Sequence, residues 1–595
     1  MKNKLLITTA LVALFSANNA FSQVREDLIV DSQTPISNQG IDEEPYYYKS
    51  IKVEKEGSLN IETSNIKTEQ DITVLGGLDL KNSVLEAGND ADDQPNNSNI
   101  LLDGATVTMN DSDLEANGNI TIKDTSLSSV STIGEPDNYG IWADGNITIE
   151  NSNINLEKSY IDSFGDITID GGVINMANME INSWRGNLNV NGGEINFKGD
   201  EDSETLLYAR KELNINGGVI NMGGAKPIID NIADSEPDAY PAYDLNINGG
   251  TINVTGKQAE ISSSKNVNIN GGTINIAEGS TLGIYGGNDQ TPTTAQLGSA
   301  AILNISGTLD TSLNGNGTLN FNSNSGKITG DVNMTSGGIM NVGLNNAVID
   351  GDATFNSGST LKLKIADSGN GSLQAANITG KEGSKLALNI TKKMEIGQTL
   401  EDVALLKGNV DNHFTNEISN NRYKVTSEDG KNFDITYENS ASDVVTDAGG
   451  SANNAQTAEA WDTLVQSSTA SDNAKAVASV LNDLSQNNEQ AYVDALTAVA
   501  PEVAPMVQKT QTETANQVFG AVSTRLTGGS ISTGGEGMSS GDNIFERAAV
   551  WVQGMFNKSK LDDTSKAKGF DADSAGVAFG AEKFVTDDTK VGIGY

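Results

Sequence analysis

The amino-acid sequence predicts an all-β protein built around a right-handed parallel β-helix. A phrase of the form D-L-N-I-N-G-G-T-I-N-V recurs through residues 57–390. Apolar residues alternate with Asn, Thr or Ser on both sides of its Gly-Gly pair, and period two is the period of a β-strand. The Gly-Gly pair supplies positive φ at a corner between two strands. Repetition of such a unit winds successive coils around one axis.

Five strict copies of the phrase set the period of the predicted coil. Their first apolar residues are Ile167, Leu188, Leu213, Leu245 and Val267. The separations are 21, 25, 32 and 22 residues, which is the period of a solenoid. Looser copies over 119–127 and 146–156 replace Gly-Gly by Lys-Asp or Glu-Asn.

An array of antiparallel hairpins is the alternative to the β-helix, because Asn-Gly is also a hairpin signal. A hairpin array does not explain the twenty-odd-residue period, so the sequence favours the coil. In a coil, Ile and Val fill the interior, and we expect Asn residues at matching positions to form side-chain amide ladders along the axis.

Composition excludes several classes of function. The 595 residues include no Cys, one His, 38 Lys+Arg and 79 Asp+Glu, which gives a net charge of −41. Without Cys there are no disulfides, zinc thiolate sites or iron–sulfur clusters, and one His cannot make a two-His metal site. The acidic balance excludes a basic surface for nucleic acid. We therefore expect no cofactor, no metal site and no nucleic-acid partner.

The first 22 residues read as a secretory signal peptide. Lys2 and Lys4 precede an apolar core over 5–15, and a small-x-small exit predicts cleavage between Ser22 and Gln23. The apolar core is too short for a helix to span a bilayer of about 30 Å. The mature chain should leave the cytoplasm, and its lack of Cys suits bacterial export.

Period and composition divide the rest of the chain into seven segments. We expect an N-terminal cap over 23–56, the β-helix over 57–390, a capping junction over 391–438, a Ser/Ala/Asp/Gly-rich linker over 439–457, a helical region over 458–527, a Gly/Ser linker over 528–547 and a second β region over 548–595. In the helical region, the i, i+3, i+4, i+7 spacing of Val477, Val480, Leu481 and Leu484 predicts a mostly polar helix with one narrow apolar stripe. Such a helix either packs on a globular neighbour or threads a polar lumen.

The second β region has the alternation of a membrane β-barrel wall. Ala575, Val577 and Phe579 alternate with small residues, and Trp551 and Phe556 are available as interfacial aromatics. A soluble hairpin would show the same alternation.

These features together resemble the autotransporters of type V secretion. The most specific parts are A-A-V-W-V-Q-G-M-F-N-K-S-K-L-D at 548–562 and G-F-D-A-D-S-A-G-V-A-F-G-A-E at 569–582, which are similar to the first two strands of the autotransporter barrel. The resemblance implies a helix inside the pore over 506–526 and a junction over 400–437 that helps the passenger to fold. It also implies the outer membrane and its barrel-assembly machinery as partners. The family barrel has more strands than the three begun here, so we expect an incomplete barrel, from a sequence fragment or a truncated gene.

The resemblance implies a cell-surface location with an extracellular β-helical passenger. We expect this passenger to act as an adhesin that contacts a host surface protein or a glycan. Trp142, Trp184 and Tyr208 each precede the first strand of a repeat by four or five residues, so they are candidates to line neighbouring coils and hold a glycan. Packing in the core or at a corner is the other reading of these aromatics.

Enzymatic function is not expected. The single histidine, His413, and the lack of a G-D-S-G phrase argue against a serine protease. Two alternatives stay open. One is a β-helical enzyme that acts on polysaccharide through a pair of carboxylates, and the other is a structural surface protein.

Overall fold

The computed structural model describes residues 26–37, 45–88, 97–132, 139–200, 204–231, 241–287, 291–412, 414, 420–465, 469–499, 548–561, 570–584 and 590–594, with four isolated residues between 512 and 520. The chain divides into two compact units. Unit 1 comprises Met1–Lys392, Leu400–Ile418 and Val425–Ile435, and unit 2 comprises Lys393–Thr399, Ser419–Lys424 and Thr436–Tyr595. The predicted signal peptide with its Ser22–Gln23 cleavage site, His413 and nearly all of the predicted pore helix lie outside the described residues.

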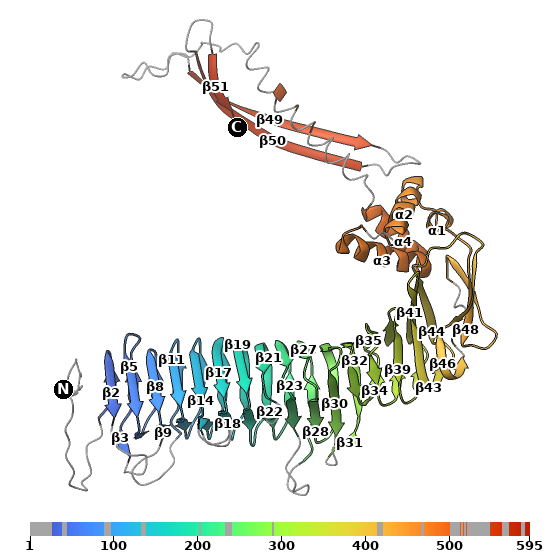
Figure 1. Cartoon of the computed structure of the whole chain (residues 1–595). Helices are drawn as coiled ribbons and strands as arrows, with labels where there is room; N and C mark the ends of the chain where they lie inside the picture. Colours follow the sequence, from blue (N-terminus) through green and yellow to red (C-terminus); the bar gives the residue numbers. More distant parts are fainter. Residues whose placement is uncertain are drawn as a thin grey trace, which may run out of the picture. The chain divides into compact units, whose positions relative to one another are not determined.

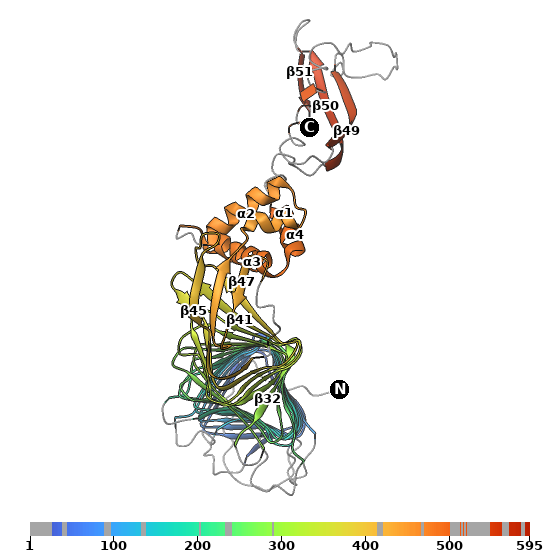
Figure 2. The same cartoon turned by 90° about the vertical axis from the view of Figure 1, so that its right-hand side faces the viewer.

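Unit 1 is a β-helix-like stack of coils with three faces of parallel strands. A strand typically pairs in parallel with the strand three positions later, as Ile51 in β4 (Ile51–Val53) does with Ile72 in β7 (Ile72–Val74). Figure 1 shows these strands side by side, and Figure 2 shows the three faces around a common axis. The parallel coil predicted from the repeat is confirmed, whereas a hairpin array would have given antiparallel neighbours.

The first face begins each coil. Its strands are β1 (Leu28–Val30), β4, β7, β10 (Ile100–Asp103), β13 (Ile120–Lys123), β16 (Ile147–Glu150), β19 (Ile167–Ala177), β21 (Leu188–Phe197), β23 (Leu213–Ile215), β26 (Leu245–Ile247), β29 (Val267–Ile276), β32 (Thr294–Ile305), β34 (Ser312–Gly315), β37 (Val332–Met334), β40 (Ala353–Phe355) and β43 (Ser372–Gly380). Of these strands, β19, β21, β29 and β32 continue around the corner into the second face.

The second face follows the corner. Its further strands are β2 (Gln33–Ser37), β5 (Ser58–Glu62), β8 (Gly77–Lys81), β11 (Thr106–Asn110), β14 (Ser126–Val130), β17 (Ser152–Glu157), β24 (Val219–Met222), β27 (Thr251–Val254), β35 (Thr318–Phe321), β38 (Ile339–Val342), β41 (Thr360–Ala366) and β44 (Lys385–Ile390).

The third face completes each coil. Its strands are β3 (Tyr46–Tyr48), β6 (Asn65–Thr68), β9 (Val84–Ala87), β12 (Asp113–Ala116), β15 (Gly140–Ala143), β18 (Tyr160–Ser163), β20 (Glu180–Ser183), β22 (Glu204–Ala209), β25 (Lys226–Asn231), β28 (Ala259–Ser263), β30 (Thr281–Gly286), β33 (Thr308–Asp310), β36 (Lys327–Ile328) and β39 (Asn346–Ile349). The start of β43 pairs with β39, and β46 (Leu406–Asn412) pairs with β43. Two short antiparallel strands, β31 (Thr291–Pro292) and β42 (Gly369–Asn370), fold back on β30 and β41.

Columns of aliphatic side chains fill the interior of unit 1. The first apolar residues of the five strict copies stand one above another, because their strands pair in register. All five are 0% exposed. Each coil thus shields the apolar residues of the next, which is how a solenoid builds a continuous core from repeats that are too small to have one.

The second glycine of each Gly-Gly pair takes positive φ at the corner. Gly172 has φ of 88° and Gly218 has φ of 79°. A Cβ on Gly172 would also lie 2.0 Å from the backbone oxygen of Ser152 in the preceding coil, so no other residue fits. In the looser copies, the positive-φ residues are Asp124 and Asn151, types that tolerate the left-handed region.

The parallel sheet extends beyond the predicted limits of 57–390 on both sides. At the N-terminal side, Leu28 in β1 already pairs with Ile51 in β4, and both side chains are buried. At the C-terminal side, β46 adds a further strand. The repeat phrase is absent from β1, but Leu28 and Val30 still alternate there as buried residues, and in β46 Leu406 is buried.

Asparagine ladders run along the outside of the coils, as predicted. The longest row joins Asn155, Asn175, Asn196, Asn221, Asn253, Asn275, Asn304, Asn320 and Asn341. Each Nδ2 donates to the Oδ1 of the preceding coil over 2.6–3.1 Å. This row lies on the second face, where it ties eight pairs of neighbouring coils together.

Unit 2 contains the four described α-helices of the chain. These are α1 (Ala441–Asp447), α2 (Ala452–Val465), α3 (Asp472–Asn487) and α4 (Glu489–Val499). Val445, Ala458, Leu481, Tyr492 and Leu496 are among the residues of their common apolar core.

Helix α1 and the start of α2 occupy the segment 439–457 that was predicted to be a linker, and α2 continues into the predicted helical region. Helix α1 begins at a capping box in which the backbone N–H of Asp443 donates to Ser440 Oγ and the backbone N–H of Ser440 donates to Asp443 Oδ2. Val444 and Val445 then enter the core. The Ser/Ala/Asp/Gly-rich composition of this segment therefore reflects helix caps and small residues at helix contacts, and not a flexible linker.

A buried arginine organises the polar side of unit 2. Arg422 donates from Nη1 and Nη2 to both carboxylate oxygens of Asp462 in α2, over 2.7 and 2.9 Å. The guanidinium also donates to Asn482 Oδ1 in α3 and to the hydroxyl of Tyr437. Tyr437 stacks on Tyr423 with ring centroids 5.1 Å apart. Desolvation of the guanidinium opposes its charge, but the bonds to Asp462 outweigh this and raise the pKa of Arg422.

Helix α3 packs through only half of the predicted apolar stripe. Its buried residues are Ala478, Leu481, Asn482, Ser485 and Gln486, at i, i+3, i+4, i+7 and i+8. Leu481 and Leu484 of the stripe pack on the core of unit 2, whereas Val477 and Val480 are 40% and 61% exposed. The helix presents Asn482 to the buried guanidinium of Arg422. Leaving a buried charge without hydrogen-bond partners costs more free energy than leaving two valines exposed.

The remaining described strands form two small sheets. In one, the order is β45 (Thr399–Ala404), β48 (Asn432–Tyr437) and β47 (Tyr423–Thr426). In the other, β49 (Ala548–Leu561), β50 (Phe570–Phe584) and β51 (Lys590–Gly594) are antiparallel neighbours. The alternation in this segment correctly predicted strands, and the barrel itself stays a prediction. None of the described helices has the length and apolarity needed to cross a membrane.

Candidate functional site

Outward-facing acidic and aromatic side chains gather on the third face of unit 1. We name this set the aromatic strip. It comprises Asp113, Glu115, Trp142, Asp144, Tyr160, Asp162, Phe164, Asn182, Trp184 and Tyr208, and it covers the successive strands β12, β15, β18, β20 and β22.

The pleat of the strands places these residues outside. Alternate residues such as Leu114, Ile141 and Leu207 point inward and are 0% exposed, so their neighbours point outward. The parallel register then aligns one outward residue from each coil in a column, which runs Glu115, Trp142, Asp162, Asn182, Tyr208. Neighbours in this column are spaced at about 4.8 Å, the distance between paired strands.

The three aromatic residues singled out from the sequence all lie in this strip. Trp142 and Tyr208 stand in the same column, three coils apart, and Trp184 contacts Tyr208 with ring centroids 6.2 Å apart. All three are half-buried, and none enters the interior. Their placement on one side of neighbouring coils is as expected, while glycan contact stays a prediction.

Carboxylates and a cation fix the orientation of the rings. The indole N–H of Trp142 donates to Asp144 Oδ1 over 3.0 Å, and that of Trp184 donates to Asp162 Oδ2 over 3.1 Å. Phe164 meets Trp142 edge to face at 4.8 Å. The guanidinium of Arg185 lies 4.5 Å from the centre of the Phe164 ring. The rings are thus held in place before any ligand arrives.

Two carboxyl groups at one end of the strip have raised pKa values. Burial raises the pKa of Asp113 to about 6, although its carboxylate accepts from the backbone N–H of Gly140 and the hydroxyl of Tyr160. Burial, followed by the charges of Asp113 and Glu86, raises the pKa of Glu115 to about 7. Burial and the charge of Asp113 also raise the pKa of Tyr160. At neutral pH, Glu115 can therefore either donate or accept a proton.

Sequence analysis missed these two carboxyl groups. The chain has 79 Asp and Glu, so no single acid stands out. An alignment of the repeats coil by coil could have identified them, because it places Asp113 and Glu115 on the same face as Trp142. In the described parts of the chain, no three acidic or histidine side chains are grouped so that they could hold a metal ion.

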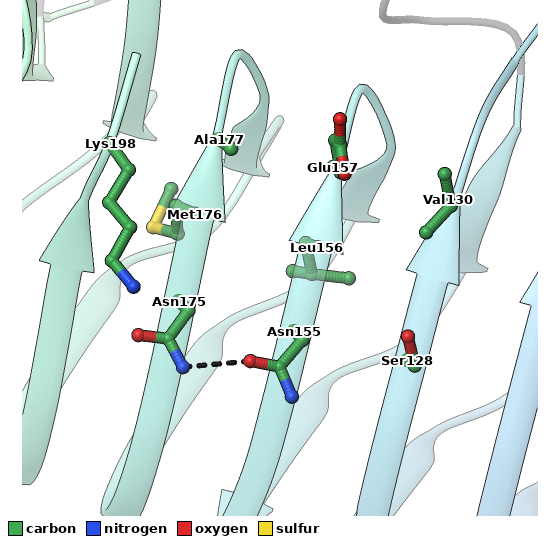
Figure 3. A pocket seen from close by; sticks show the side chains of 9 residues that line it. All are labelled: Ser128, Val130, Asn155, Leu156, Glu157, Asn175, Met176, Ala177 and Lys198. Carbon is green, nitrogen blue, oxygen red and sulfur yellow. Dashed lines mark hydrogen bonds between the residues drawn. The ribbon is translucent and has the colours of Figure 1, made fainter.

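A depression lies on the second face. It has a volume of about 210 Å³ and is lined by residues that include Asn155, Asn175, Glu157 and Lys198. Figure 3 shows these side chains, with the amide of Asn175 bonded to Asn155. No aromatic ring lines this groove, so the aromatic strip is the stronger candidate for ligand binding.

Comparisons with models of protein families, with curated proteins and with solved structures found no match.

Proposed function

We propose that this chain is a cell-surface autotransporter whose β-helix acts as an adhesin that binds a glycan through the aromatic strip. The observation that carries the proposal is the strip itself, in which Trp142, Trp184 and Tyr208 lie half-exposed beside carboxylates on one face. Aromatic rings pack on the apolar faces of sugars, and carboxylates accept hydrogen bonds from their hydroxyls.

The β49–β51 sheet supports the export part of the proposal. One of its faces carries Val552, Phe556, Val577, Phe579 and Val591, which are 50–83% exposed. An apolar outward face is what a strand in contact with lipid requires. The outer membrane and its barrel-assembly machinery are the partners proposed on this basis, together with a host glycan or surface protein.

Surface location is tested by expressing the full chain in a Gram-negative host. Added protease should digest the β-helix on intact cells, while a periplasmic marker protein stays intact. Protection of the β-helix until the outer membrane is permeabilised would contradict export.

Glycan binding is tested on a glycan array with the purified full chain. Trp184→Ala should lose the signal, because the substitution removes a ring and the donor to Asp162. Tyr285→Ala is the matched control: Tyr285 is a half-buried residue of the same column, but it lies three coils beyond Tyr208. Equal binding by both variants would exclude the strip as the site.

A polysaccharide-cleaving enzyme is the second candidate, and one observation favours it. Asp113 and Glu115 are two apart on one strand, on the same face, with pKa values near those of a general acid. Release of reducing ends from a bound polysaccharide, lost in Glu115→Gln with binding retained, would establish cleavage. Binding without any release would leave the adhesin.

A further inference from the structure

The aromatic strip repeats along the axis with the rise of the coil. Trp142, Phe164, Trp184 and Tyr208 come from four successive coils, because β15, β18, β20 and β22 pair in turn. Paired strands are about 4.8 Å apart, which is close to the length of one pyranose in an extended β-linked chain. A glycan that runs along the axis would therefore stay in step with the coils.

The two ends of the strip offer different contacts. Phe164 is already covered by Trp142 and Arg185, so it supports Trp142 and is not itself a free platform. Trp184 and Tyr208 form a pair at the other end. From Trp142 to Tyr208 there are three coil steps, or about 14 Å. A chain of four sugars is the shortest that can touch both ends.

Polar groups between the two ends suit hydroxyl groups. Asp162 lies next to Trp142 in the column, and its Oδ2 holds the indole of Trp184. Asn182 follows Asp162 in the column, and the two residues are only 2% and 6% exposed. Asp144, which is exposed, is the carboxylate that a ligand hydroxyl can reach directly.

Charge selects against anionic glycans. Asp113, Glu115, Asp144 and Asp162 all belong to the strip, and the chain as a whole carries −41. Of the nearby cations, Lys67 is paired with Glu86 at 2.8 Å, Arg185 stacks on Phe164, and Arg210 follows Tyr208 by two residues. The acids of the strip outnumber these cations, so uronate or sulfate groups would meet an excess of negative charge here.

We propose that the aromatic strip binds an uncharged, linear, β-linked glycan that lies along the coil axis, with one sugar for each coil from Trp142 to Tyr208. This inference rests on the proposed glycan-binding function. It adds the direction, the length and the charge class of the ligand.

A length series tests the inference on the purified full chain. The probes are cello-oligosaccharides and N-acetylglucosamine oligomers of two to six sugars, measured by calorimetry. In at least one series, affinity should rise about five- to tenfold from three sugars to four, when the second end is reached, and then level off. Equal affinity for the trimer and the tetramer, or a continued rise beyond four, would overturn the axial placement.

Variants locate the two ends. Trp142→Ala should lower the affinity for the tetramer about five- to tenfold and leave the trimer, held by Trp184 and Tyr208, nearly unchanged. Trp184→Ala should weaken both, and Tyr285→Ala should weaken neither. Equal loss for trimer and tetramer in Trp142→Ala would contradict one sugar per coil.

Charged probes separate this inference from the broader proposal. Oligouronates and deacetylated, cationic oligomers of the same lengths form the other arms. Strip-dependent binding of only a charged or branched glycan would overturn the inference and keep the glycan-binding function. No strip-dependent binding of any glycan, here or on the array, would remove both.

Discussion

Unit 1 and unit 2 place their polar side chains in opposite ways. In unit 1, each asparagine of the long row bonds to equivalents in the neighbouring coils, outside an apolar interior. In unit 2, the single Arg422 gathers Asp462, Asn482 and Tyr437 within the buried part of the unit. The repeat spreads its polar contacts over many equal sites, whereas the helical unit concentrates them at one. Loss of one residue should therefore matter far more in unit 2.

The largest effect is expected from Arg422→Ala. The substitution leaves Asp462 and Asn482 without their cation. Breaking a buried pair costs about 3–5 kcal/mol, and because Asp462 is 32% exposed we expect a loss at the lower end, about 3 kcal/mol. Hydrogen exchange of α2 and α3 in the full chain measures the loss of protection. Lys424→Ala, an exposed cation two residues away, is the control and should stay near wild type. Unchanged protection in Arg422→Ala would refute the idea of a concentrated contact.

Two neighbouring residues of helix α3, Leu481 and Val480, test which side of the helix contributes to the stability of unit 2. Leu481→Ala should destabilise unit 2 by about 2–4 kcal/mol, because Leu481 is 3% exposed in the core. Val480→Ala should change the stability by less than about 0.5 kcal/mol, because Val480 is 61% exposed. Denaturant unfolding followed by helical circular dichroism reports both values. A loss in Val480→Ala as large as that in Leu481→Ala would show that Val480 is packed as well.

The asparagine row should show a smaller, position-dependent effect. Asn253→Ala removes a bond to Asn221 and a bond from Asn275, and should cost about 1–2 kcal/mol. Asn341 ends the row with one such bond, so Asn341→Ala should cost about half as much. Equilibrium unfolding of the β-sheet signal measures the difference. Equal costs at the middle and at the end would show that the row does not act as a chain of contacts.

A further effect is a change in pH dependence at Glu115. Because its folded pKa is raised above its ordinary value, the folded protein binds a proton more tightly than the unfolded chain does. The contribution of Glu115 to stability should therefore grow as the pH falls from about 8 to about 5, by about 2 kcal/mol. Glu115→Gln should flatten this slope in melting temperatures, while Glu157→Gln, exposed on the second face, should not. A parallel slope for Glu115→Gln would exclude the buried carboxyl as its source.

The coil could be predicted from the sequence because its rules are local and repeated. Period-two alternation, the Gly-Gly corner and the spacing of Ile167, Leu188 and Leu213 already define inward positions and stacking. The extension to β1 was missed because the phrase is absent there, although Leu28 and Val30 still alternate as buried residues.

The helical unit could not be predicted in the same way, because its decisive contact is distant in sequence. The apolar spacing gives the helix correctly and half of its packed face: Leu481 lies in the core, whereas Val480 does not. The buried polar residue of the helix, Asn482, bonds to Arg422, which lies 60 residues earlier. No local sequence pattern predicts a partner at that distance. In the candidate site, the aromatic residues could be picked out from the sequence because aromatics are rare in this chain. Asp113 and Glu115 could be recognised as site residues only after the coils were aligned.

The asparagine row also has a direction. In every link from Asn341 back to Asn155, the later residue gives its hydrogen and the earlier one receives it. Aligned amide dipoles polarise one another along such a string. The row therefore has a net dipole along the coil axis. An asparagine in the middle of the row has two polarised hydrogen bonds and one at either end has a single bond, so the coils in the middle are held more strongly. Local unfolding of the row should begin at its two ends, near Asn155 and Asn341.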